Sequence, residues 1–200
     1  MSIVGLDLAG VETRPTGFCQ LVNMNVKTSL LYDDKTIIET IKQANPSVVG
    51  IDAPLSLPFG RKSIEEKSNI HLRNCDRELL KRGIRFFPIT LGPMRKLTTR
   101  GINLKRVLQE QNTLSIETYP GGAQDVLGIP RKQKGIQNLA EGLKNLGIVG
   151  INSQMSDHEL DAITCAYVGK LFLEGKAEVY GSLCEGIVMP PSEKQRKLSV

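Results

Sequence analysis

The chain opens with three short hydrophobic runs that turn-rich segments separate. The runs cover residues 3–9, 17–23 and 29–32, and the segments between them contain Gly, Pro and polar residues. Because these links are too short to hold a helix, successive runs have to turn back on one another. The pattern predicts three strands in an antiparallel meander.

Helical and strand patterns alternate after the meander. Ile37, Ile38 and Ile41 recur at helical spacing within residues 35–44, Asp34 caps this helix, and Pro46 stops it. The continuous apolar run at 48–53 is typical of a buried strand, and 113–119 predicts a further strand. We expect helices at 62–81, 104–111, 136–146 and 156–173, an irregular segment at 85–101, and short strands within 178–191.

This order of elements defines the expected fold class. A strand that is reached through a helical crossover lies parallel to its neighbour. The chain therefore predicts a ribonuclease H-like α/β fold: a mixed five-stranded sheet in the order 3-2-1-4-5, three antiparallel strands followed by parallel ones, with flanking helices. We expect one domain over residues 1–191 and a basic, flexible tail over 192–200.

Three of the predicted strands end in the same four-residue pattern of apolar, small, apolar and acidic residues. The acids are Asp7, Asp52 and Glu117. Side chains alternate across a strand, so each acid shares its face with the Gly or Ser two residues earlier, which leaves space beneath the carboxylate. Carboxylates on adjacent strands repel one another unless a cation lies between them, and oxygen ligands favour Mg²⁺ or Mn²⁺. The alternative is that each acid is a solvated turn residue.

The long predicted helix adds candidates to this site. Asp161 shares a largely apolar helix face with Thr164, Cys165 and Val168, where an acid is costly unless it is paired or bound to metal, so we predict a metal ligand. His158, one turn earlier, is a possible assistant, and its alternative role is that of a capping or surface residue. Asp157 lies in the first turn, where the helix dipole alone accounts for an acid.

The charge and composition of the chain indicate which kind of molecule it binds. The net charge is +5, and basic residues cluster around Arg73, Arg95 and Lys134, which we predict to hold phosphate; solvated helix faces are the alternative. Asp76 is placed to orient Arg73. The sequence shows no signal segment or membrane span, so we expect a cytoplasmic protein with nucleic acid as its partner and leave a homodimer open. The four scattered cysteines predict reduced, mostly buried thiols.

Several motifs together resemble a known family, the domain of unknown function 429 family, described as predicted nucleases of ribonuclease H fold. The matching segments span nearly the whole chain; they are GLDLAG at 5–10, GIDAPLSLP at 50–58, RNCDREL at 73–79, IETYP at 116–120 and HELDA at 158–162. The resemblance implies a metal-dependent phosphodiesterase with Asp7, Asp52, Glu117 and Asp161 in the acidic positions.

The predicted activity is therefore hydrolysis of DNA or RNA at a site with one or two metal ions. Three alternatives stay open. The chain is a nucleic-acid-binding scaffold without catalysis, or it hydrolyses a small phosphorylated metabolite, or it is a phosphotransferase of the actin and sugar-kinase type, which residues 5–10 and Thr13 also resemble. Length argues against the last, because such enzymes need two similar domains.

Overall fold

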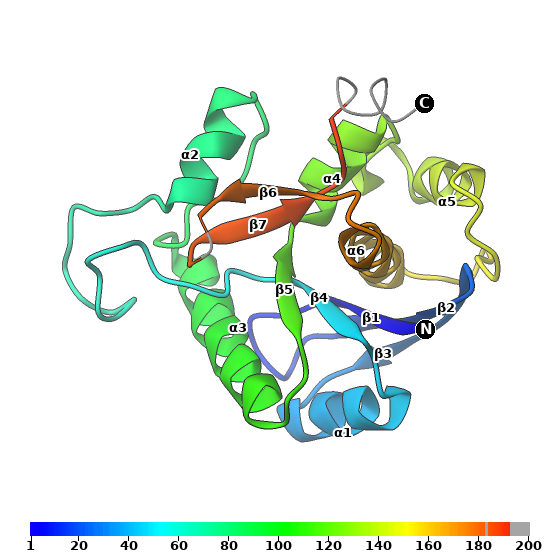
Figure 1. Ribbon diagram of the computed structural model, residues 1–200, viewed down its shortest axis with the longest axis horizontal. Coiled ribbons are helices and arrows are strands. Elements are labelled where there is room, and N and C mark those ends of the chain that lie inside the picture. Colours follow the sequence, from blue (N-terminus) through cyan, green and yellow to red (C-terminus); the bar gives the residue numbers. More distant parts are fainter. Residues whose placement is uncertain (183, 193–200) are drawn as a thin grey trace.

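The computed structural model describes residues 1–182 and 184–192 and contains one mixed sheet of seven strands (Figure 1). Its order is β3-β2-β1-β4-β5-β7-β6, so the predicted order 3-2-1-4-5 is confirmed and a C-terminal hairpin extends it. Apart from Ser192, the expected tail lies outside the described residues. The strands are β1 Ser2–Asp7, β2 Thr16–Val22, β3 Asn25–Leu31, β4 Val48–Asp52, β5 Ser115–Thr118, β6 Glu178–Gly181 and β7 Gly186–Met189.

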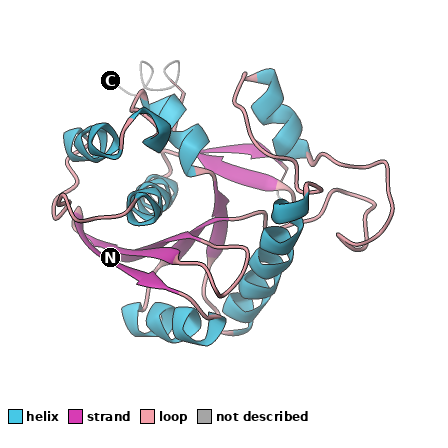
Figure 2. Ribbon diagram, turned by 180° about the vertical axis from the view of Figure 1, so that it is seen from behind, coloured by secondary structure: helices cyan, strands magenta, loops and turns pink. Residues whose placement is uncertain are grey.

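Helices cover both faces of the sheet, as the two opposite views show (Figures 1 and 2). One hydrophobic core joins the sheet to α4, α5 and α6, and a second joins its other face to α1 and α3. The short helix α2 packs beside the β6–β7 hairpin. The helices are α1 Asp34–Ala44, α2 Asn74–Lys81, α3 Gly92–Glu110, α4 Pro120–Leu127, the 3₁₀ helix η1 Lys132–Lys134, α5 Ile136–Asn145 and α6 Asp157–Leu173.

The glycines beneath the strand-end acids allow α6 to approach the sheet closely. A Cβ atom at Gly5 would lie 2.0 Å from the carbonyl oxygen of Ala162, and one at Gly50 would lie 2.6 Å from that of Cys165. The expectation that these small residues leave open space is therefore wrong. They bring the helix backbone against β1 and β4, which places side chains of α6 next to the ends of both strands.

Two helix predictions differ from the structure, and one further helix was not predicted. The helix expected at 62–81 forms only over Asn74–Lys81, because the preceding segment wraps around the buried guanidinium of Arg61. Arg61 donates to four carbonyl oxygens of this segment, those of Ser63, Ile64, Glu66 and Ile70. Helix α3 begins at Gly92 with Pro93 in its first turn, well before the predicted start at 104. Helix α4 was missed.

The cysteines and the helices bear on two expectations from composition, reduced thiols and the lack of a membrane span. Cys19, Cys75 and Cys165 are buried and free of disulfides, and Cys184 is exposed. Among the described residues, no helix combines the length and the apolar character that crossing a membrane requires.

Candidate active site

Two carboxylates meet at the carboxyl ends of β1 and β4. Asp7 and Asp52 are direct partners in the parallel register of these strands, as are Gly5 and Gly50 before them. Partners in register point to the same face of a sheet, and neighbouring strands are about 4.8 Å apart. Both acids therefore lie on the face that α6 covers, next to its first turns.

The N-terminus of α6 supplies the next groups. Ser156 caps the helix: its hydroxyl accepts from the Glu159 amide, while the Glu159 carboxylate accepts from the Ser156 amide at 2.9 Å. This start directs His158 to Asp7, with 2.6 Å between His158 Nδ1 and Asp7 Oδ2. The hydrogen bond to Asp7 is the main reason that the pKa of His158 is raised.

Asp161 is buried one turn further along α6, with both carboxylate oxygens engaged. Its Oδ1 accepts a hydrogen bond of 2.8 Å from Gln124 Nε2, on α4. Its Oδ2 lies 2.9 Å from Lys132 Nζ, which also lies 3.0 Å from Asp157 Oδ2. Lys132 on η1 thus joins two acids of α6. Partial burial acts to lower the pKa of Lys132, but the opposing effect of Asp161 and Asp157 is larger and raises it.

Negative charge accumulates where these elements meet. The pKa of Asp52 is raised well above its ordinary value, first by burial and then by the charges of Asp7 and Asp161, while Lys132 acts in the opposite direction. Burial also raises the pKa of Asp161. A group of carboxylates whose ionised forms are disfavoured in this way is stabilised by a cation, and hard oxygen donors suit Mg²⁺ or Mn²⁺. We call Asp7, Asp52, Asp157, Asp161, His158 and Lys132 the acidic centre.

The acidic centre nevertheless already contains a cation from the chain itself. Within residues 1–182 and 184–192, no three His, Cys, Asp or Glu side chains converge closely enough to hold a metal ion as they stand. The ammonium of Lys132 lies between two of the acids instead.

Glu117 does not join this group, which corrects the expectation of three acids on one face. In the register of β4 and β5, Glu117 is the partner of Ile51, and Thr118 is the partner of Asp52. Glu117 therefore points to the opposite face, where its Oε2 accepts from Arg73 Nη1 and from the Leu55 amide, both at 2.7 Å. Burial raises the pKa of Glu117, although Arg73 opposes this.

Arg73 is part of the same buried ion pair rather than a free phosphate ligand. Its side chain is only 3% exposed, and it donates to both oxygens of Asp76 as well as to Glu117. Asp76 also accepts from the Arg73 amide at 2.9 Å, which ties the start of α2 to the pair. We call Arg73, Asp76 and Glu117 the buried triad.

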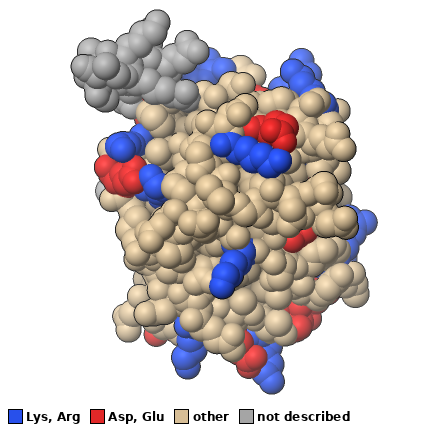
Figure 3. Space-filling view, turned by 90° about the vertical axis from the view of Figure 1, so that its right-hand side faces the viewer, with Lys and Arg blue, Asp and Glu red and all other residues tan. Residues whose placement is uncertain are grey.

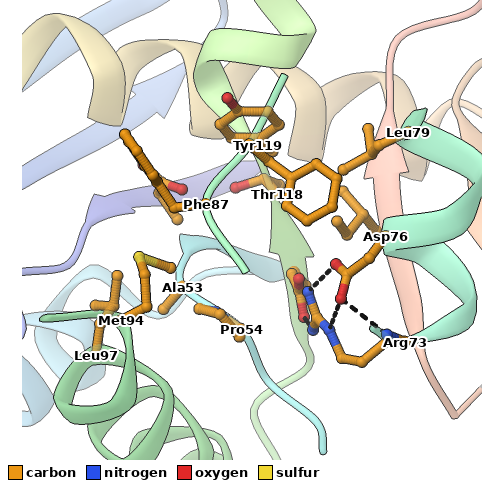
Figure 4. Close-up of a pocket in the computed structure, with 14 residues that line it drawn as sticks. Ala53, Pro54, Arg73, Asp76, Leu79, Phe87, Met94, Leu97, Thr118 and Tyr119 are labelled. Atoms are coloured by element: carbon orange, nitrogen blue, oxygen red, sulfur yellow. Dashed lines mark hydrogen bonds and ion pairs between the residues drawn. The ribbon is translucent and has the colours of Figure 1, made fainter. Parts of the chain in front are cut away.

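A pocket of about 170 Å³ lies between the acidic centre and the buried triad, and both Asp52 and Glu117 line it. Figure 4 shows Arg73 and Asp76 at one side of this pocket and Phe87, Met94, Leu97 and Tyr119 around the rest. Phe87 is 72% exposed. The pocket thus combines one wall of aromatic and apolar side chains with a carboxylate of the acidic centre.

The other two basic residues predicted to hold phosphate lie outside this pocket. Arg95 forms an ion pair with Glu65. Lys134 is exposed and lines a second pocket, of about 340 Å³, with Arg85 and Arg131. Arg131 also lies over the ring of Tyr119, 5.7 Å from its centroid, so the second pocket adjoins the first. On the face shown in Figure 3, by contrast, the basic side chains lie singly or next to acids.

Comparison with known families gives one assignment. The model of a family described as proteins of unknown function, DUF429, matches residues 5–183. The chain belongs to this family. No curated protein matches the sequence.

One solved structure supports the fold of this DUF429 protein. The structure of Thermus thermophilus RuvC in complex with a Holliday junction substrate superposes with a TM-score of 0.53 and 11% sequence identity, covering 88% of this chain and 96% of that one. A second structure of Thermus thermophilus RuvC gives 0.47 and 13%, covering 94% and 100%. RuvC has a ribonuclease H-like fold, so the first match, together with the strand order, confirms the predicted fold class.

Two residues at the site of this DUF429 protein, Gln124 beside the acidic centre and Lys132 within it, escaped the sequence analysis. Gln124 lies on the missed helix α4, whose signals were Pro120 at its first position and Gly128 just after its end. Lys132 lies two residues before Lys134 in the same basic cluster. Within that cluster nothing in the sequence distinguishes the lysine that faces α6 from the one that faces solvent.

Proposed function

We propose that this protein hydrolyses phosphodiester bonds in nucleic acid, with a divalent metal ion held by the acidic centre. One observation carries the proposal. Asp7 and Asp52 end adjacent parallel strands in register, and Asp161 lies opposite them on α6. Burial and the charges of Asp7 and Asp161 disfavour the ionised form of Asp52. Such a group takes a hard divalent cation in preference to a neutral ligand.

Asp7 and Asp52 are the residues that would hold Mg²⁺ or Mn²⁺, with Asp161 adding negative charge. When bound, such an ion polarises a phosphate and lowers the pKa of an attacking water. His158 orients the Asp7 carboxylate through its hydrogen bond, and with its side chain 37% exposed it can pass a proton to solvent. In this proposal Glu117 acts indirectly, because its ion pair with Arg73 shapes the pocket beside Asp52.

The two adjoining pockets supply the means of binding a nucleotide chain. The aromatic rings of Phe87 and Tyr119 offer stacking surfaces beside Asp52, and stacking on aromatic side chains is a general way of binding unpaired bases. Lys134 and Arg85 at the second pocket offer positive charge to further phosphates of the chain, whereas Arg131 is paired with Asp125. This arrangement favours a nucleic acid over a small phosphorylated metabolite, which would not need the second pocket.

The proposal is tested with purified protein, Mn²⁺ or Mg²⁺, and end-labelled substrates. The panel holds single-stranded DNA, RNA, duplex DNA and a four-way junction, the last because RuvC is seen with such a substrate. We expect cleavage of at least one substrate that requires metal and is abolished by Asp7→Asn. The matched control is Glu141→Gln, which changes an exposed acid on α5 that forms an ion pair with Lys144.

Two results would decide against the proposal in different ways. Metal binding by calorimetry without cleavage of any substrate would remove the nuclease activity and retain the metal site. Salt-sensitive binding of duplex that Asp7→Asn leaves unchanged, again without cleavage, would favour the scaffold alternative.

A further inference from the structure

Lys132 occupies the side of the acidic centre that α6 forms. Its Nζ atom lies 2.9 Å from Asp161 Oδ2 and 3.0 Å from Asp157 Oδ2. The other oxygen of Asp161 accepts from Gln124. Both Asp161 oxygens thus already have donors from the segment that runs from α4 to η1.

A divalent ion on Asp161 would compete directly with this lysine. Mg²⁺ binds carboxylate oxygen at about 2.1 Å, so an ion on Asp161 Oδ2 would lie no more than about 5 Å from the ammonium nitrogen. Two cations at that separation repel strongly where water is partly excluded, and Asp161 is buried. The Asp157 and Asp161 side therefore holds either the lysine or an ion.

Asp7 and Asp52 are not engaged in the same way. Asp7 forms a hydrogen bond with His158, whose ring is 37% exposed. Lys132 forms its ion pairs with the two acids of α6, Asp157 and Asp161. The strand-end carboxylates, which lie in register, are therefore the place for an ion, and the α6 carboxylates are the place for the lysine.

We infer that this protein is a one-metal enzyme in which the Lys132 ammonium, held by Asp157 and Asp161, takes the position of a second metal ion. The inference rests on the proposed function and adds the number of ions and a further catalytic residue to it. A lysine ammonium has three N–H donors, and two are used by the α6 acids. The third is directed to a phosphate oxygen of the substrate, so that Lys132 stabilises the charge that develops there.

The number of bound ions tests this directly. Calorimetry with Mn²⁺ is carried out on the full chain for the wild type, Lys132→Met and Lys132→Arg, with thermal melting to verify that each variant is folded. Lys132→Met removes the charge and keeps much of the side-chain length, whereas Lys132→Arg keeps the charge. We expect one Mn²⁺ in the wild type and in Lys132→Arg, and two in Lys132→Met, with the second lost again in Lys132→Met combined with Asp161→Asn.

Each alternative result has a distinct meaning. Two Mn²⁺ in the wild type would overturn the inference and leave the proposed metal-dependent function in place. One Mn²⁺ in folded Lys132→Met, bound with unchanged affinity, would also overturn it. No Mn²⁺ in either protein would overturn the metal site itself and the inference with it. If Lys132→Met does not fold, the wild-type stoichiometry alone still decides between one ion and two.

Cleavage provides an independent measurement. Lys132→Met should lower kcat by about 100-fold while KM changes little, because the lost contact is one that strengthens as charge develops. A 100-fold rise in KM with unchanged kcat would mean that Lys132 binds the substrate and the transition state equally well. Lys132 would then not be a substitute for a metal ion.

Discussion

The acidic centre and the buried triad lie at the same edge of the sheet but on opposite faces, and they treat their carboxylates differently. In the triad, Arg73 donates to Asp76 and Glu117, and the three side chains are nearly fully buried. The acidic centre has four carboxylates, those of Asp7, Asp52, Asp157 and Asp161, and only one lysine and one partly exposed histidine to balance their charge. Positive charge is better matched to negative charge in the triad.

This difference separates an acid that supports the structure from an acid that is available for chemistry. A buried, hydrogen-bonded ion pair is costly to disrupt, and its groups have little capacity left for a ligand. A group of carboxylates with too few partners raises its own pKa values and attracts a cation. The two regions therefore predict opposite responses to substitution, one in stability and the other in activity.

The largest expected effect is on activity at the acidic centre. Asp52→Asn should lower metal-dependent cleavage by about 1000-fold, which corresponds to about 4 kcal/mol in the activation barrier. The same change should not destabilise the fold. Because the raised pKa of Asp52 means that its ionised form is disfavoured in the folded state, the wild type loses stability as pH rises above about 4, and the amide avoids this loss.

Cleavage assays and urea unfolding at pH 7 without metal measure the two responses to Asp52→Asn. A variant that is markedly less stable than the wild type would place Asp52 with the structural acids and break the comparison.

The next effect is on stability at the triad. Arg73→Met should lower the free energy of unfolding by about 4 kcal/mol, because it leaves Glu117 and Asp76 buried without their partner. Adding Glu117→Gln to Arg73→Met should restore part of this stability, since it removes one of the two uncompensated charges. Urea unfolding of the single and double variants forms the test, with Arg77→Met on α2 as an exposed control. Full stability of Arg73→Met would show that Glu117 is free to serve as a ligand.

A third effect follows from the close contact of α6 with the sheet. Gly5→Ala should destabilise the protein by about 3 kcal/mol, because the new methyl group would lie 2.0 Å from the Ala162 carbonyl oxygen. The control is Gly92→Ala, where no atom lies within 4 Å of an added Cβ. Thermal melting of both variants measures the difference. Equal stability would mean that α6 can move away from β1, and the distances in the acidic centre would then not be maintained by packing.

The smallest effect is the pH dependence contributed by His158. Its pKa is raised mainly by the hydrogen bond to Asp7, so this stabilisation is fully present below about pH 6.5 and is lost as pH rises through the raised pKa. Because the ring is 37% exposed, solvent screening limits the effect to about 0.5 kcal/mol. Unfolding of wild type and His158→Gln between pH 5 and about pH 9 measures it. A difference that grows with pH would contradict this sign.

The outline of the fold could be predicted because each element carries its own local signal. Alternating or continuous apolar runs marked β1, β4 and β5, and the crossover rule ordered them correctly. The helix expected at 62–81 failed because a single long-range feature, the burial of Arg61 among four carbonyl oxygens, outweighs local helix preference there. Helix α4 was missed because its two adjacent glycines favour a turn in isolation.

The sequence by itself determined that acids stand at the ends of hydrophobic strands and that one more lies on an apolar helix face, because periods of two and 3.6 residues are properties of single elements. Only the tertiary structure decided which of these acids meet. The register between β4 and β5 places Glu117 on the face of the sheet opposite Asp52. The path of the chain from α4 to η1 places Lys132 in an ion pair with Asp161. Both depend on contacts between segments far apart in the chain, and no local period encodes such contacts.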